Sequence, residues 1–149
     1  MDQTLLAEQL RLFQEACVRA GLRVTYQRLE IYRELADAMD HPTVEMLHAR
    51  LIRKIPTLSL DTVYRTMDTL SRHGLIHKVE TSASQARFEV VHEHHHHLIC
   101  SRCAEITDFQ WPSMDAMNLP DDLRPWGNIV RCNTVVYGIC KRCLKNNDS

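Results

Sequence analysis

Two C-x-x-C pairs constrain this chain more than any other feature of its sequence. They are Cys100-Ser101-Arg102-Cys103 and Cys140-Lys141-Arg142-Cys143. Together they supply four thiolates, the number of ligands that a closed tetrahedral zinc site requires. The segment between the pairs must then fold back on itself to bring them together. A closed site predicts a structural role and leaves no coordination position for catalysis. Buried free thiols or a redox dithiol are the alternatives.

The composition is that of an ordinary globular protein, with 149 residues, 44% hydrophobic and 25% charged. No apolar run reaches the roughly 18–20 residues of a membrane helix, so we expect no membrane partner. The N-terminal stretch is amphipathic and contains acids, which does not fit a signal peptide. We therefore expect a cytoplasmic protein. In a reducing compartment, C-x-x-C pairs favour a metal site over disulfides.

The charge does not single out a nucleic-acid-binding half. Residues 1–90 hold 12 basic and 12 acidic side chains, and the whole chain has a net charge of −1. Any contact with DNA must therefore come from a local face.

The first 90 residues carry the pattern of a winged helix-turn-helix domain. Helical spacing of apolar residues predicts four helices, over 4–19, from Thr25 through Met39, from Thr43 to before Pro56, and over 59–73, closed by Gly74. Two strands follow, over 75–80 and 86–91, joined by 81–85. The fourth helix would enter the major groove of DNA. Its outward face is predicted to carry Thr62, Arg65, Thr66 and Thr69.

The sequence pattern changes after residue 90, so we expect a second, smaller α/β domain over 91–149 that contains zinc. Strands are predicted over 97–100, 105–109 and 130–138, and three prolines between them limit any helix to a short one. Residues 88–93 are the expected hinge. The fold class is therefore α+β.

Four consecutive histidines, His94 to His97, precede the first C-x-x-C pair. Neighbouring residues of a strand point to opposite faces, so His95 and His97 share one face while His94 and His96 share the other. The run can therefore serve two separate metal sites. Solvated histidines are the alternative.

The sequence resembles the Fur (ferric uptake regulator) family of bacterial metal-responsive repressors over nearly its whole length. The segments that carry the resemblance are GLRVTYQR (21–28), HPT (41–43), SLDTVYRTMDTLSRHGLI (59–76), RFEV (87–90), HHHHLICSRC (94–103), ITDF (106–109) and YGICKRC (137–143). The resemblance implies a homodimer with an N-terminal DNA-binding domain and a C-terminal dimerisation domain. When loaded with metal, such a protein binds double-stranded operator DNA as a repressor.

The resemblance also assigns metal ligands. The structural zinc site is Cys100, Cys103, Cys140 and Cys143. The regulatory site, which joins the two domains, is His41, Glu89, His95, His97 and Asp108. Nitrogen and oxygen ligands of this kind suit Fe²⁺, Mn²⁺, Zn²⁺ and their neighbours, so geometry and availability decide the metal. We expect Fe²⁺ or Mn²⁺ as the regulatory metal.

A further site in some family members uses a His, an acid, an acid and a His at positions that are His94, His96, Asp115 and Cys132 here. The departures leave two expectations open, an unoccupied site or one shifted toward a softer metal by the thiolate. For DNA, the resemblance points to Arg23, Ser59, Thr62, Tyr64 and Arg65.

Within the family, Asp108 looks like the peroxide-sensing PerR branch, in which bound Fe²⁺ reacts with H₂O₂ and ligand histidines are oxidised. The matching targets are His41 and His95. The alternative is a regulator of iron, manganese or zinc uptake.

A zinc enzyme or a zinc-stabilised interaction module would be a different class. Neither of these classes needs the predicted helix and wing over 59–76, so we expect no enzyme and no small-molecule substrate beyond metal ions and H₂O₂.

Overall fold

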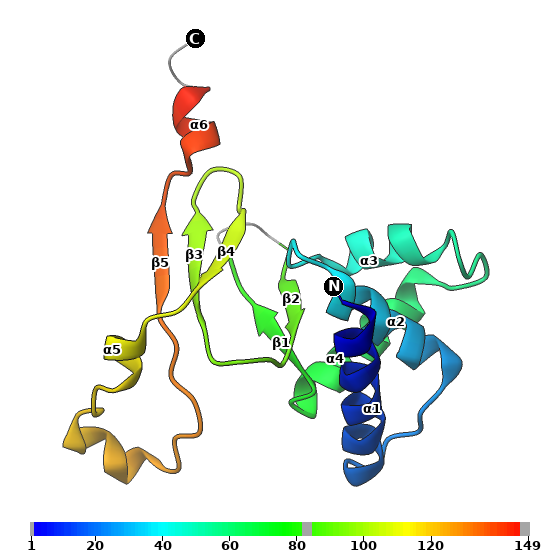
Figure 1. Ribbon diagram of the computed structural model, residues 1–149, viewed down its shortest axis with the longest axis horizontal. Coiled ribbons are helices and arrows are strands. Elements are labelled where there is room, and N and C mark those ends of the chain that lie inside the picture. The colour runs from blue at the N-terminus through cyan, green and yellow to red at the C-terminus, as the bar shows by residue number, and fades with distance from the viewer. Residues whose placement is uncertain (1, 82–84, 147–149) are drawn as a thin grey trace. The chain divides into compact units, whose positions relative to one another are not determined.

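The computed structural model describes residues 2–81 and 85–146, which form two compact units (Figure 1). The first unit is Met1–His92 and the second begins at Glu93, two residues beyond the boundary expected from the sequence. Among the described residues, no helix is long and apolar enough to cross a membrane.

The first unit contains four helices and a two-stranded hairpin. Its elements are α1 (Gln3–Arg19), α2 (Tyr26–Asp37), α3 (Val44–Leu51), α4 (Leu60–Arg72), β1 (Ile76–Val79) and β2 (Arg87–Val90). The strands are antiparallel and pair Ile76 with Val90 and His77 with Glu89. The order of elements confirms the winged-helix prediction, although residues 82–84 of the predicted connection lie outside the described residues.

The helix boundaries follow the capping residues. Thr25, Thr43 and Ser59 each accept a hydrogen bond from the backbone N–H three residues later, as expected for N-caps. Gly74 follows the last turn of α4 with a φ of +70°, a conformation that glycine adopts without steric cost. The sequence therefore predicts where α4 begins and ends.

The core of the first unit draws one apolar stripe from every helix and from the hairpin. Phe13 of α1 stacks on Tyr32 of α2 with ring centroids 3.9 Å apart. The buried stripe of α4 contains the following residues: Val63, Thr66, Met67 and Leu70. This packing fixes the orientation of α4, because the face opposite the stripe is left exposed.

Two inward and outward assignments in this unit were wrong. Thr66 is 7% exposed and lies in the core, because it falls three residues after Val63 and four before Leu70 on the same helical stripe. Met39 is 84% exposed, because α2 ends at Asp37 and the chain leaves the helical register before it.

The second unit is built on a three-stranded sheet in the order β4-β3-β5. Its elements are β3 (His96–Cys100), β4 (Ile106–Phe109), α5 (Pro112–Asp115), the 3₁₀ helix η1 (Asp121–Trp126), β5 (Val135–Gly138) and α6 (Lys141–Lys145). β3 pairs antiparallel with β4 and parallel with β5. The strands predicted near 97–100 and 105–109 are confirmed.

The predicted strand over 130–138 was too long, since β5 begins only at Val135. At Thr134 the backbone carbonyl accepts from the N–H of His97 at 3.1 Å, while the backbone N–H donates to the side-chain Nδ1 of His96 at 2.8 Å. The N–H of Thr134 is therefore used by a side chain and does not extend the ladder.

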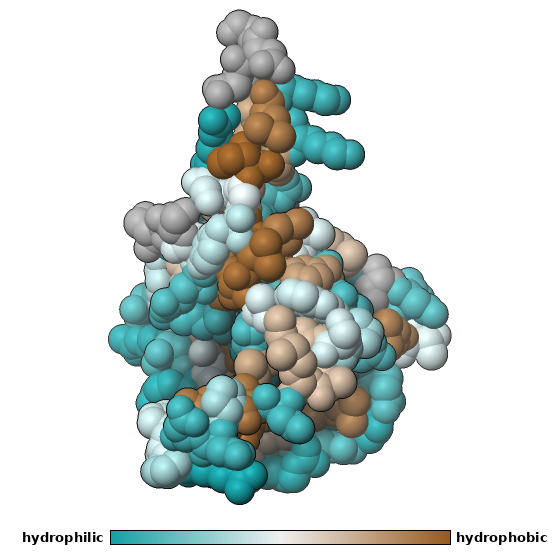
Figure 2. Space-filling view, turned by 90° about the vertical axis from the view of Figure 1, so that its left-hand side faces the viewer, coloured by the Kyte–Doolittle hydropathy of each residue, from teal (hydrophilic) through white to brown (hydrophobic). Residues whose placement is uncertain are grey.

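Apolar side chains of two neighbouring strands of this sheet are exposed. Leu98 of β3 lies directly opposite Val136 of β5, and both are exposed. Tyr137, Trp126 and Val130 are also exposed in this unit. Figure 2 shows the second unit from the side of β5 and α5, and hydrophobic side chains form patches there among hydrophilic ones.

Candidate metal centres

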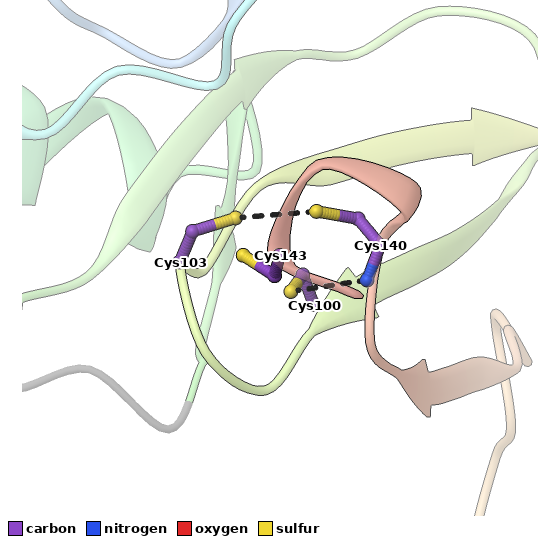
Figure 3. Close-up of side chains that lie close together, drawn as sticks. All are labelled: Cys100, Cys103, Cys140 and Cys143. Atoms are coloured by element: carbon purple, nitrogen blue, oxygen red, sulfur yellow. Dashed lines mark hydrogen bonds between the residues drawn. The ribbon is translucent and has the colours of Figure 1, made fainter. Parts of the chain in front are cut away.

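The four cysteines of the C-x-x-C pairs converge at one end of the sheet (Figure 3). Cys100 ends β3 and lies opposite Gly138, the last residue of the parallel strand β5. Both C-x-x-C pairs therefore lie at the same end of the sheet. One ligand atom from each of the four lies within 4.8 Å of the others, and the sulfurs of Cys103 and Cys140 are 3.8 Å apart. The parallel pairing of β3 and β5 therefore accounts for the fold-back that the sequence required.

Backbone amides prepare this cluster for negative charge. The N–H of Cys103, followed by that of Cys140, lowers the pKa of Cys100 to about 6. The N–H of Glu105 and then the guanidinium of Arg142 lower the pKa of Cys103. The neighbouring Cys140 side chain raises the pKa of Cys143 to about 12. Four sulfurs at this spacing are the donor set that structural zinc prefers, so the residues fit that ion.

His41 and Glu89 meet within the first unit. Nε2 of His41 lies 3.0 Å from Oε2 of Glu89, and both side chains are buried. His41 has a φ of +48°, in the left-handed region, just before Pro42. Such a backbone conformation costs of order 1–3 kcal/mol and persists where surrounding contacts enforce it.

Contacts from β2 hold that loop. The backbone N–H of Phe88 donates to the carbonyl of Pro42 at 3.1 Å, and the Arg87 guanidinium donates to the carbonyl of His41 at 3.3 Å. The strained residue is therefore tied to the strand that carries Glu89.

His77 is a neighbour of Glu89 that the sequence reasoning missed. It lies opposite Glu89 in the hairpin, with Nδ1 3.8 Å from the second carboxylate oxygen, Oε1. Alternation along 75–80 and 86–91 shows which residues of each strand share a face, but the partner of Glu89 depends on the hairpin register.

His95, His97 and Asp108 meet within the second unit. The Nε2 atoms of His95 and His97 are 3.1 Å apart and lie 3.7 and 3.5 Å from Oδ1 of Asp108. Nδ1 of His95 lies 2.8 Å from the carbonyl oxygen of Glu93. A carbonyl can only accept, so Nδ1 carries a proton, and in the neutral ring Nε2 then carries the lone pair. This is the arrangement usual for a histidine that ligates a metal through Nε2.

His94 and His96 project from the opposite face, as strand alternation predicted, and both contact Asp115. Their Nε2 atoms lie 3.0 and 2.7 Å from Oδ1 of that carboxylate. These three residues line a cavity, and Cys132 lines it too. Among the described residues, however, the close cluster of ligand atoms contains only the two histidines and Asp115.

The predicted DNA-contacting residues of the fourth helix lie on or beside its exposed face. Tyr64 donates a hydrogen bond from its hydroxyl to Glu45, and Nε of Arg65 lies 2.9 Å from Asp61 one turn earlier. At the start of the helix, the hydroxyls of Ser59 and Thr62 are 2.8 Å apart.

Arg23 lies in the segment between α1 and α2, where its side chain is exposed and its carbonyl accepts a bond from Arg28 at 2.7 Å. The predicted DNA contacts therefore come from α4 and from a separate exposed segment of the same unit.

Comparison with known proteins identifies the family. The family model described as "Ferric uptake regulator family" matches residues 19–120. The peroxide operon regulator of Bacillus subtilis is 29% identical over 141 residues, covering 95% of this chain and 97% of that protein. The peroxide-responsive repressor PerR of Staphylococcus epidermidis is 30% identical over 125 residues, covering 84% of this chain and 83% of that protein.

Solved structures agree with this match. The Helicobacter pylori ferric uptake regulator, described as having three functional metal binding sites, superposes with a TM-score of 0.74 at 25% identity and covers 93% of both chains. A zinc-bound manganese uptake regulator superposes with a TM-score of 0.65 at 32% identity, covering 86% of this chain and 98% of the other. The family match, the relatives and the two-unit fold lead to one conclusion: this chain belongs to the ferric uptake regulator family.

Proposed function

We propose that this member of a family of metal-responsive transcriptional regulators is a cytoplasmic, homodimeric repressor that binds operator DNA when its regulatory site holds Fe²⁺ or Mn²⁺. We further propose that it senses peroxide through oxidation of its ligand histidines. The observation that carries the proposal is the convergence of His95, His97 and Asp108, with the lone pair of His95 on the nitrogen that faces the other two.

The first unit supplies the remaining proposed ligands, His41 and Glu89, which already contact each other. A metal ion that takes ligands from both units would favour the arrangement in which all of them reach it. The ion then shifts the population of arrangements by its differential affinity for them. This is how metal binding would control DNA binding.

The structural zinc in this proposal is held by Cys100, Cys103, Cys140 and Cys143. When bound, zinc neutralises the thiolates and contributes folding free energy directly. The cluster joins the ends of β3 and β5 to α6, so it stabilises the unit that carries His95, His97 and Asp108.

The DNA-binding surface in this proposal is the exposed face of α4 with Arg23. Ser59 and Thr62 lie at the helix N-terminus, where hydroxyl groups commonly contact phosphates. Tyr64 and Arg65 are exposed further along and would contact bases. A bidentate contact from an arginine to guanine contributes about 1–3 kcal/mol of discrimination.

The homodimer is supported by the exposed apolar residues of the second unit. Leu98 and Val136 stand side by side on one sheet face and are both exposed. A second copy of the chain would remove this surface from water, which is favourable by about 25 cal/mol per Å² of apolar area.

Peroxide sensing is supported by Asp108 and by the two peroxide regulators among the relatives. A bound Fe²⁺ would supply the redox chemistry that activates peroxide, which a bound Mn²⁺ would supply far less readily. In the net reaction, one oxygen atom of H₂O₂ enters a ring C–H of His41 or His95 and the other leaves as water. The oxidised ring is a weaker donor, so the protein would release its metal and its operator.

The test compares operator binding by the Fe²⁺ and Mn²⁺ forms before and after low H₂O₂. We expect the Fe²⁺ form alone to lose binding, with the mass of one added oxygen on a peptide that contains His41 or His95. Asp108→Glu should reduce the sensitivity, because a longer ligand of the same charge alters the site. Equal resistance of both forms, without the added oxygen, would contradict peroxide sensing.

The second candidate is a regulator of metal uptake, which the 32% identity to the manganese uptake regulator favours. In that case the operator affinity would depend on which metal is bound and would not respond to peroxide. The same experiment therefore separates the two functions.

A further inference from the structure

We infer that the His94–Asp115–His96 cluster is a hydrogen-bonded staple that holds the second unit together, and that it does not form a metal site. Some family members have a further metal site at these positions. Here the surrounding backbone fixes a proton on the ring nitrogen of His96 that would have to bind the metal.

The key contact is the hydrogen bond from the backbone N–H of Thr134 to Nδ1 of His96, at 2.8 Å. A backbone N–H can only donate, so Nδ1 must carry the lone pair of the ring. In a neutral imidazole the proton then lies on Nε2. That nitrogen is 2.7 Å from Oδ1 of Asp115 and donates to it. The ring therefore has no lone pair that points at the cluster.

A metal bound through Nε2 would need the opposite arrangement. Its lone pair would go to the metal and the proton would move to Nδ1, where it would face the N–H of Thr134 at hydrogen-bond distance. Two donors would then oppose each other. This would cost the existing bond and leave a buried donor unsatisfied, a penalty of about 1–3 kcal/mol.

His95, the preceding residue, is an internal comparison. Its Nδ1 faces the carbonyl oxygen of Glu93, so the proton lies on Nδ1 and Nε2 has the lone pair. Backbone groups thus fix the proton on opposite ring nitrogens of these two adjacent histidines. His95 is prepared to bind a cation, and His96 is prepared to donate to a carboxylate.

The staple connects three parts of the second unit. His96 belongs to β3, Asp115 is the last residue of α5, and Thr134 immediately precedes β5. His96 is only 1% exposed and contacts the rings of Phe109 and Trp111. His94 adds a second contact to the same oxygen of Asp115, at 3.0 Å. A buried, fully bonded imidazole in an aromatic setting holds these segments without a cation.

The departure at position 132 agrees with this reading. Cys132 is exposed and lines the cavity beside the cluster, but its sulfur lies outside the close set of ligand atoms. The position that is a histidine in the family pattern therefore adds no ligand here, and the acid of that pattern at position 96 is replaced by the donating His96.

The first test is nitrogen NMR of the histidine rings in the protein that holds only its structural zinc. Spectra are recorded before and after saturation with additional Zn²⁺, which is diamagnetic and replaces Mn²⁺ as the probe. We expect His96 to keep a protonated Nε2 and an unprotonated Nδ1 in both states, while His95 changes at Nε2. A change at Nε2 of His96 to a metal-bound nitrogen would overturn the inference.

The second test counts metal ions by titration and elemental analysis. His94→Ala should leave the number of bound ions unchanged, whereas His97→Ala should lose about one per chain. The double variant His96→Asp with Cys132→His restores the family pattern and should gain about one. Loss of an ion from His94→Ala would overturn the inference even if the double variant fails to fold.

Discussion

At the scale of single residues, the four clustered cysteines place the sharpest demand on the chain. Backbone amides favour the thiolate at Cys100, whose pKa is about 6, while the Cys140 side chain raises the pKa of Cys143 to about 12. Without a cation, the four sulfurs cannot all be thiolates near neutral pH. A divalent ion removes this conflict, because thiolate binding to zinc displaces the protons.

We therefore predict that Cys100→Ser loses the zinc and unfolds the second unit. Structural zinc contributes about 10–16 kcal/mol of apparent binding free energy in small zinc domains, far more than a few hydrogen bonds. Zinc content by elemental analysis and thermal unfolding measure the effect. Cys132→Ser is the matched control, since that exposed thiol lies outside the cluster, and it should behave like the parent. A zinc-free Cys100→Ser protein with parental stability would contradict the assignment.

Strand alternation predicted which histidines of the run share a face, and the contacts to Asp108 and Asp115 agree with that prediction. It could not predict which ring nitrogen carries the proton, because the deciding groups are backbone atoms. For His96 the group belongs to Thr134, which is 38 residues away in the chain. His77 was missed because its pairing with Glu89 depends on hairpin register.

At the scale of elements, one side of α4 packs into the core while its other faces are exposed. Its buried stripe of Val63, Met67 and Leu70 packs into the core, while Arg65 and Arg72 on other faces each pair with an aspartate one turn earlier. Exposed ion pairs of this kind contribute about 0–1 kcal/mol to stability. Their removal should therefore leave the fold intact.

This allows Arg65→Ala to be compared with Arg72→Ala. Both remove an exposed arginine from an i, i+4 pair, but only Arg65 is predicted to reach the bases. We expect Arg65→Ala to weaken operator binding by about 1–3 kcal/mol, with unchanged zinc content and melting temperature. Arg72→Ala should have a smaller effect that is insensitive to operator sequence. Fluorescence anisotropy with operator and scrambled DNA measures this, and equal losses in both variants would place base contact elsewhere.

The elements of the first unit were predictable because their signals are local. N-cap residues and Gly74 mark the ends, and apolar spacing marks the faces. The errors arose where tertiary contacts decided the outcome. Thr66 is polar but lies on the buried stripe, and the backbone N–H of Thr134, just before β5, bonds to a side chain.

At the scale of the whole molecule, the proposed regulatory metal would take its ligands from both units. One unit carries His41 and Glu89, and the other carries His95, His97 and Asp108. If one ion needs ligands of both sets, metal affinity and DNA affinity are coupled. Such coupling is reciprocal and typically amounts to 1–3 kcal/mol, or about 5–150-fold in affinity.

The corresponding prediction is that His95→Ala and His97→Ala each abolish the gain in operator affinity produced by Mn²⁺. Removing one ligand weakens the shared site, so the metal no longer favours the DNA-binding arrangement, while the four cysteines retain zinc. His94→Ala is the control, because His94 lies in the cluster with Asp115 that we assign to structure. Operator titrations with and without Mn²⁺, together with zinc analysis, give the result.

A full Mn²⁺ response in both variants would show that the regulatory ion is bound elsewhere. Loss of the response only in His94→Ala would move it to the opposite face of the same strand.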